Sequence, residues 1–328
     1  MQGPVGVGSA HVGARSHTER KALHPVNPKR FKLMKLWSHY HVAKSVDEAL
    51  ALLARYEGKA RVIAGGTDLL LDIQQGNHPP VEALVDITRI KELNTISMDG
   101  NQLTLGAGVT HTAIETNSML LSRATALTES CGVVGGPQVR NVATIGGNVA
   151  HALPAADGTL SLVALRATAE IASMAGREWC EIGDLFLGAG QSRVHPSSQL
   201  ITNFRFKLDV AGEASAFKRI MRPQGVALPV LGCAAWIKLD AARERFVDVS
   251  ICVGPVSPTP IRAAAVESAL IGQIANDATI AHAAQVARET LHPRTSKYRA
   301  TAEYRVEMIE LLVRESLTVA VERAKAGR

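Results

Sequence analysis

Two glycine pairs constrain this chain more than any other feature of its sequence. Gly65-Gly66 stands in VIAGGTDLLL, after an apolar run typical of a buried strand, and Gly146-Gly147 stands in NVATIGGNVAHALPAADG. A backbone without Cβ atoms lets another group approach closely, and successive N–H groups can form an anion-binding concavity. An ordinary turn or loop is an alternative interpretation of either stretch alone. Together, each after a strand-like segment, they favour one extended ligand that contains a diphosphate.

Short polar side chains accompany both glycine pairs. Thr67 follows the first pair and adds a hydroxyl donor, while Thr144 and Asn148 flank the second pair. Asp157 is the lone acid after the second pair and can accept hydrogen bonds from ribose hydroxyls, and Pro154 stiffens the loop before it. These side chains strengthen the interpretation of the two stretches as a nucleotide-binding site.

Signatures of catalysis by the chain itself are missing from the sequence. There is no P-loop and no GxSxG motif, and GAGVTH has His111 where a dinucleotide fingerprint needs its third glycine. Neither His111 nor His151 nor His282 has the spacing of metal ligands. We therefore expect no catalytic residue and no metal site here. A ligand-binding chain of this kind predicts that the chemistry belongs to a cofactor.

The four cysteines stand far apart without a CxxC pair, which predicts neither a disulfide framework nor an iron–sulfur or zinc site. They are Cys131, Cys180, Cys233 and Cys252. Separated thiols of this kind are typical of a reducing compartment, so we expect a cytoplasmic protein. No apolar run in the sequence is long enough to span a bilayer.

The formal net charge of +6 comes almost entirely from the first 33 residues. That segment holds six Lys or Arg against one Glu, so the rest of the chain holds 30 basic and 29 acidic residues. A body without a basic stripe argues against nucleic-acid binding. Residues 1–33 have no apolar periodicity and no signal-peptide core, so we expect a disordered or non-native extension before Met34, with a transit peptide as the alternative.

Helical and strand patterns alternate through the first two thirds of the chain. A capping box, S-x-x-E, predicts a helix over 45–56, and a second helix is expected over 112–131. Asp99-Gly100 predicts a hairpin with a type I′ turn, and Ala175-Gly176 predicts a second hairpin. From residue 213 onward strands come first and three helices follow, which predicts a separate α+β domain.

Both glycine stretches resemble the FAD-binding medium subunit of the molybdenum hydroxylases, the xanthine dehydrogenase and carbon monoxide dehydrogenase flavoprotein family. AGGTDLL is similar to that family's first flavin motif, and ATIGGN with PAAD to its second. FKRIMRPQGVALPVLGCAAWIKL and ICVGPVSPTPIRAAAVESAL are similar to later blocks, so the resemblance runs from Met34 to near the C-terminus. It implies an α+β fold, with a two-subdomain PCMH-type FAD-binding domain over 34–210. A smaller α+β C-terminal domain, an antiparallel sheet plus helices, would follow over 213–326.

The resemblance also implies a noncovalent FAD and assigns residues to it. The segments 63–69 and 144–148 would hold the diphosphate through their backbone and side chains. Asp157 would match an acid on the ribose or adenine side, Ile201 an apolar cofactor contact, and Lys218 a lysine near the flavin. The cofactor-binding residues expected are Ile63, Ala64, Gly65, Gly66, Thr67, Asp68, Leu69, Thr144, Gly146, Gly147, Asn148, Asp157, Ile201 and Lys218.

The same resemblance implies partners. A subunit of this family works with a large molybdopterin subunit, which hydroxylates the substrate, and a small subunit with two 2Fe–2S clusters, in a heterotrimer or its dimer. Its FAD receives electrons from the clusters and passes them to an acceptor such as NAD. The lack of clustered cysteines argues against the 4-hydroxybenzoyl-CoA reductase branch, which carries an extra cluster. Leu153 and Gly158-Thr159 depart from the usual continuation of the second motif.

Two other functions remain open at this point. One is a stand-alone PCMH-type flavin oxidase, although the C-terminal domain is small for a substrate domain of such an enzyme. The other is a non-redox, nucleotide-binding scaffold subunit. A flavin spectrum of the purified protein distinguishes the scaffold from the other two, and turnover without partners distinguishes the oxidase.

Overall fold

The structure is a computed structural model that describes residue 3 and residues 36–222, 228–297 and 299–327. Contacts within the chain divide it into Met1–Lys35 and Leu36–Arg328, and the following description concerns the second unit. The extension expected over residues 1–33 lies, except for Gly3, outside the described residues.

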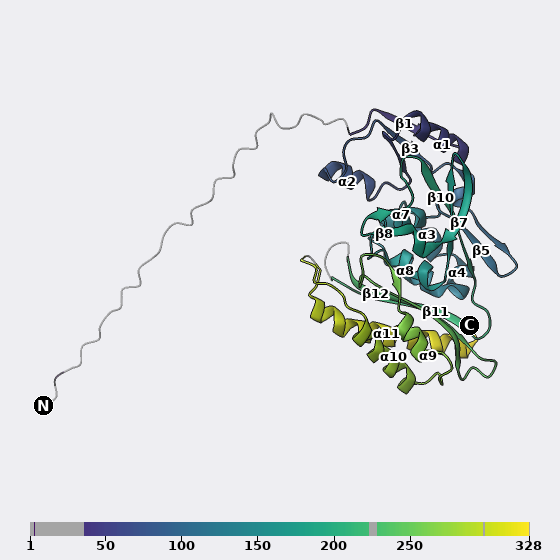
Figure 1. Cartoon of the computed structure of the whole chain (residues 1–328), viewed down its shortest axis with the longest axis vertical. Coiled ribbons are helices and arrows are strands. Elements are labelled where there is room, and N and C mark those ends of the chain that lie inside the picture. Colours follow the sequence, from purple (N-terminus) through teal and green to yellow (C-terminus); the bar gives the residue numbers. More distant parts are fainter. Residues whose placement is uncertain (1–2, 4–35, 223–227, 298, 328) are drawn as a thin grey trace. The chain divides into compact units, whose positions relative to one another are not determined.

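The first part of this unit is a small parallel sheet with the order β1-β3-β2 (Figure 1). Parallel strands need crossover connections, and α1 and α2 lie in these two connections. The N-cap bond of the predicted capping box is confirmed, because Ser45 Oγ accepts a hydrogen bond from the N–H of Glu48 at 3.1 Å. The Glu48 carboxylate accepts from the N–H of Lys44 at 2.8 Å instead of that of Ser45. The elements are β1 (His39–Val42), α1 (Val46–Arg55), β2 (Ala60–Ile63), α2 (Leu69–Gln75) and β3 (Ala83–Asp86).

The second part is a five-stranded antiparallel sheet with the order β4-β5-β10-β6-β7. A short 3-10 helix, η2 (Lys91–Asn94), precedes it, while η3 (Ile182–Leu185) and the pair β8 (Phe186–Gly188) and β9 (Gln191–Ser192) follow β7. The strands of the sheet are β4 (Ile96–Asp99), β5 (Gln102–Gly106), β6 (Thr168–Ser173), β7 (Gly176–Glu181) and β10 (Gln199–Lys207).

Both predicted hairpins form, but the first turn differs from the prediction. Asp99 pairs with Gln102, so the turn residues are Gly100 and Asn101. Gly100 has a φ of +59°, whereas Asn101 is not among the described residues with positive φ. A positive φ at the first central position alone is the pattern of a type II′ turn, so the type I′ prediction over Asp99-Gly100 is wrong.

The single helix predicted over 112–131 is also wrong, because three short helices occupy this region. They are α3 (His111–Glu115), α4 (Ser118–Arg123) and α5 (Thr125–Gly132). Asn117 interrupts the run by accepting hydrogen bonds from the N–H groups of Met119 and Leu120, which starts a new helix. Ala124, with a φ of −155°, separates the next two helices.

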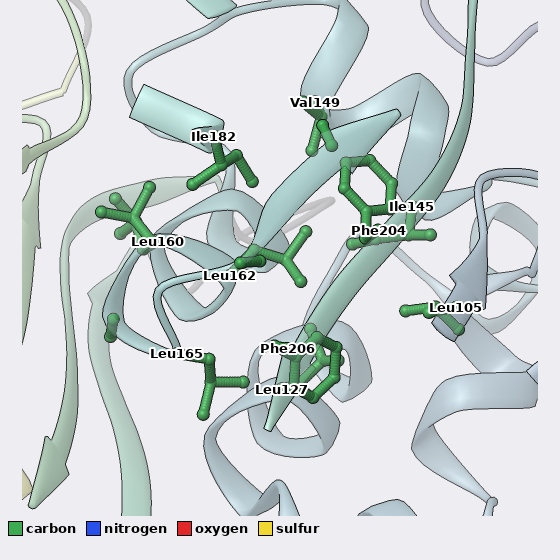
Figure 2. Packing of buried hydrophobic residues seen from close by; sticks show 14 of the residues in the cluster. Leu105, Leu127, Ile145, Val149, Leu160, Leu162, Leu165, Ile182, Phe204 and Phe206 are labelled. Atoms are coloured by element: carbon green, nitrogen blue, oxygen red, sulfur yellow. The ribbon is translucent and has the colours of Figure 1, made fainter. Parts of the chain in front are cut away.

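Three more helices follow, and two of them, α7 (Ile145–Ala150) and α8 (Asp157–Ala164), complete the main hydrophobic core of this part of the chain. The third, α6 (Pro137–Arg140), has no buried residue. Figure 2 shows Ile145 and Val149 of α7 next to Phe204 of β10, and Leu160 and Leu162 of α8 belong to the same core. The first residues of α7 are therefore anchored in the core, which fixes the position of the second glycine pair.

The last part is a four-stranded antiparallel sheet, β11-β12-β13-β14, with helices on both faces. α9, α10 and α11 pack on one face, and α5 and α8 pack on the other. Strands before helices were predicted here, and they are found. The elements are β11 (Glu213–Met221), β12 (Pro229–Leu239), β13 (Phe246–Gly254), β14 (Ile261–Arg262), α9 (Ala264–Leu270), α10 (Asp277–Thr290) and α11 (Ala302–Ala326).

A buried carboxylate, Asp209, stands between β10 and β11. Ser215 Oγ donates to one of its oxygens at 3.1 Å, and Trp236 Nε1 donates to the other at 2.9 Å. Burial raises its pKa from 3.8 to about 7. Because the pKa is higher in the folded state, Asp209 favours folding at low pH, and this contribution is lost as the pH rises through about 7.

We predict that Asp209→Asn removes this pH dependence while keeping an acceptor for Trp236. Between pH 5 and pH 8 the wild type should lose about 2 kcal/mol of unfolding free energy relative to the variant. Urea unfolding of both proteins at the two pH values measures the difference. A constant difference across this range would contradict the buried, raised-pKa carboxylate.

Candidate functional site

The first glycine pair lies in the loop between β2 and α2. The N–H groups of residues 64–69 have no hydrogen-bond partner among the described residues. Gly66 has a φ of +69°, a conformation that other residues rarely adopt. This loop therefore offers consecutive free N–H donors, which are suited to an anionic group such as a phosphate.

The second glycine pair differs, because it begins a helix and its N–H groups are already used. The segment before it is the helix α6 and one isolated bridge, Thr110 to Thr144, so the strand expected before this pair is not found. Gly146 N–H donates to the carbonyl of Ala107 at 2.8 Å, and Gly147 N–H donates to Thr144 Oγ1 at 3.1 Å. This segment can meet a ligand with its surface, but its first N–H donors are occupied.

Two of the four glycines are needed because the chain packs against itself. A Cβ atom on Gly65 would lie 2.1 Å from the carbonyl oxygen of Val142. A Cβ atom on Gly146 would lie 2.5 Å from the carbonyl oxygen of Ala107. Both distances are too short for any side chain, so the bare backbone at these positions serves backbone packing. Backbone packing is therefore a reason for glycine at 65 and 146 that the sequence did not predict, and a contact of these two glycines with a ligand stays a prediction.

The contact of Gly65 with Val142 brings the two motifs side by side. Gly147 is the exposed member of the second pair, and an added Cβ atom would meet only Thr144 Oγ1, at 3.2 Å. The imidazole of His151, at the end of α7, lies 3.7 Å from an Asp68 oxygen and 3.4 Å from an Asp72 oxygen of the first motif. The two predicted stretches therefore lie side by side, as one shared site requires.

Two more predicted side chains are tied to α8. Asn148 Oδ1 accepts hydrogen bonds from the N–H of Thr159 at 3.1 Å and from its hydroxyl at 3.2 Å. Asp157, the first residue of α8, has a side chain only 5% exposed, and its Oδ2 lies 2.6 Å from Arg219 Nη1. Its other oxygen, Oδ1, is buried and has no partner among the described residues. Burial raises the pKa of Asp157 to about 6, and the nearby Arg219 opposes this shift.

Of the two remaining predicted residues, Ile201 lies next to the second glycine motif, and Lys218 lies on the far face of the C-terminal sheet. Ile201 is buried in the core beneath α7. Lys218 alternates along β11 with Phe217 and Arg219, which face α5 and α8, so it lies on the face that carries α11. A role for Lys218 near the flavin stays a prediction. Arg219 was not among the residues predicted for the site. Neighbouring residues of a strand point to opposite faces of the sheet, so Arg219 lies on the face opposite to that of Lys218.

No group of His, Cys, Asp and Glu among the described residues could hold a metal ion. In the same part of the chain, no helix combines the length and the hydropathy needed to cross a bilayer. Two open surface hollows, of about 530 and 620 Å³, lie along α10, on the helical side of the C-terminal sheet and not at the glycine motifs.

We predict different effects for two glycine substitutions. Gly65→Ala should lower the unfolding free energy by about 1–3 kcal/mol, because its Cβ atom requires Val142 to move. Gly147→Ala, in an open helical position, should stay within about 1 kcal/mol of wild type. Urea unfolding followed by circular dichroism measures both. Equal stability of Gly65→Ala and wild type would disprove the close contact.

Comparison with known proteins gives a consistent result over both parts of the chain. Residues 30–206 match the family described as "FAD binding domain in molybdopterin dehydrogenase", and residues 215–320 match "CO dehydrogenase flavoprotein C-terminal domain". The nicotinate dehydrogenase FAD-subunit of Eubacterium barkeri is 27% identical, over 88% of this chain and 97% of that protein. The carbon monoxide dehydrogenase medium chain of Afipia carboxidovorans is 30% identical, over 88% of this chain and 96% of that protein.

Solved structures agree with these relatives. The carbon monoxide dehydrogenase of Hydrogenophaga pseudoflava has a chain with a TM-score of 0.81 and 29% identity, covering 87% of this chain and 98% of that one. Quinoline 2-oxidoreductase of Pseudomonas putida has a chain with a TM-score of 0.79 and 26% identity, and the match covers 88% of this chain and 98% of that one. The sequence motifs, the fold and these similarities lead to one conclusion: the chain belongs to the FAD-binding medium subunits of the molybdenum hydroxylase family.

Proposed function

We propose that this oxidoreductase chain carries electrons within a heteromeric molybdenum hydroxylase. Its FAD would receive them from 2Fe–2S clusters on a small partner subunit and pass them to an acceptor such as NAD. Molybdopterin would lie on a large partner subunit. The observation that carries the proposal is the row of free N–H donors over residues 64–69, held against the second motif by the close contact of Gly65 with Val142.

The residues present fit FAD. The free N–H groups and the Thr67 hydroxyl would hold the diphosphate, and the exposed backbone of Gly147 would let it lie close to α7. Asp157 Oδ1, a buried acceptor without a donor, would accept a hydrogen bond from a hydroxyl or amino group of the cofactor. FAD supplies the exchange of one or two electrons when it is bound.

The names of the relatives support a subunit over a stand-alone oxidase. They are called an FAD-subunit, a medium chain and, in Paenarthrobacter nicotinovorans, a dehydrogenase complex subunit. This chain spans 95–97% of those three proteins. A scaffold without redox function would not need a site that matches FAD-binding relatives over both domains.

We predict that Gly147→Val weakens FAD binding at least about tenfold, because its side chain would project from the exposed backbone of α7 on which the diphosphate would lie. One lost charge-assisted hydrogen bond costs about 1.5–3 kcal/mol, and about 1.4 kcal/mol corresponds to tenfold. Flavin titration of the FAD-free proteins measures the affinity, and circular dichroism checks the fold.

Gly183→Val is the matched control, because Gly183 is exposed and an added Cβ atom there has no neighbour within 4 Å. It should bind FAD as wild type does. Wild-type affinity in a folded Gly147→Val protein would exclude the second motif from the site. Flavin that stays on the chain after denaturation would contradict noncovalent binding.

A second prediction concerns the assembly. The tagged chain, purified from its host, should bring FAD together with molybdenum and iron that reside on other chains, and removing the FAD should abolish NAD reduction by that complex. Metal analysis of the separated subunits and a flavin assay test the composition. Oxidation of a substrate by the chain alone, without partners, would instead favour the stand-alone oxidase.

A further inference from the structure

A buried ion pair joins the FAD-binding part of the chain to the C-terminal sheet. Asp157 begins α8, Arg219 lies on β11, and their side chains are 5% and 6% exposed. One guanidinium nitrogen of Arg219 holds Asp157 Oδ2 at 2.6 Å, and another lies 3.2 Å from the sulfur of Met221. The pair is thus fixed from two sides, by a helix of one domain and a strand of the other.

One oxygen of this pair has no partner among the residues that the structure describes. Asp157 Oδ1 and Arg219 Nε are both buried, and neither has a hydrogen bond among the described residues. Leaving a buried acceptor without a donor costs about 1–3 kcal/mol, and more when the acceptor is charged. An external donor at Oδ1 would remove that cost.

Three titratable groups face the Asp157 carboxylate from the elements around it. Arg219 comes from β11, Arg299 from the segment before α11, and the Cys131 thiol from α5. Burial raises the pKa of Asp157 to about 6, while both guanidinium groups favour its charged form. Burial likewise raises the pKa of Cys131, so its thiol stays neutral at physiological pH. Arg219 is the only one of the three that hydrogen-bonds Asp157.

We infer that Arg219 is a positioning residue for the FAD site. It keeps Asp157 ionised and turns the carboxylate so that Oδ1 accepts a hydrogen bond from a hydroxyl or amino donor on the nucleotide side of FAD. The C-terminal domain therefore takes part in cofactor binding through Asp157, without itself touching that donor. This inference rests on the proposed function.

The pH dependence of FAD binding tests this role. In the wild type, FAD affinity should hold above pH 7 and fall as the pH drops through about 6, because protonation of Asp157 removes its charge and turns one of its oxygens into a hydroxyl donor. Arg219→Met removes the charge that favours ionisation, so the affinity loss should move to higher pH. At pH 7 we expect FAD to bind Arg219→Met about tenfold more weakly than it binds the wild type. At pH 9 the difference in FAD affinity between the two proteins should be smaller. Arg219→Lys retains the charge and should restore most of the binding.

A double-mutant cycle separates this role from a structural one. If Arg219 acts through Asp157, then Arg219→Met should add little to the effect of Asp157→Asn on FAD affinity. The double variant replaces the buried ion pair by two neutral groups of similar size, so we expect it to fold even if one of the single variants does not. Its FAD affinity can then still be measured. Urea unfolding of each FAD-free protein gives the stability control.

Three results would overturn the inference. The first is an FAD affinity and pH profile of Arg219→Met that equal those of the wild type. The second is a loss of FAD affinity in Arg219→Met that is equal at every pH and is not restored by Arg219→Lys, and the third is additivity of the Arg219→Met and Asp157→Asn effects on FAD affinity. A wild-type chain that binds no FAD at all would instead refute the proposed function, so the two failures are distinguishable.

Discussion

The site depends on one close backbone contact, that of Gly65 with Val142. A Cβ atom added to Gly65 would lie only 2.1 Å from the Val142 carbonyl oxygen, so only glycine fits at this position. The contact places the loop after β2 against the segment that leads into α7, and residues 64–69 keep their N–H groups free. An anion site built from main-chain donors requires such support, because free donors are otherwise satisfied within the chain.

The C-terminal sheet supports the same site from the other side. Its strands pack on α5 and α8, and Phe217, Ala234 and Cys252 belong to the core that also contains the first residues of α7. Through Arg219 this sheet also reaches the Asp157 carboxylate. Under the proposed function, the fold thus positions two kinds of polar group, donors that would hold the diphosphate of FAD and an acceptor for its nucleotide side.

Local signals in the sequence predicted much of this fold, and nonlocal contacts explain what they missed. The helix that begins at Ser45, both hairpins and the order of strands and helices after residue 213 follow from short-range patterns. Asn117 was an available but unused signal for a helix start within 112–131. The role of Gly146 could not be predicted, because its contact, Ala107, is 39 positions away and only the folded sheet brings them together. The burial of Asp157 Oδ1 without a partner among the described residues could likewise not be predicted, because the side chain packs against a strand that begins only at residue 213.

Backbone hydrogen–deuterium exchange, with and without FAD, tests most directly which donors hold the cofactor. We expect FAD to slow exchange in peptides covering residues 64–69, whose N–H groups have no partner in the described part of the chain. Peptides covering residues 145–148 should change little, because those N–H groups already donate to Val109, Ala107 and Thr144. Protection confined to residues 145–148, with none at 64–69, would contradict this expectation.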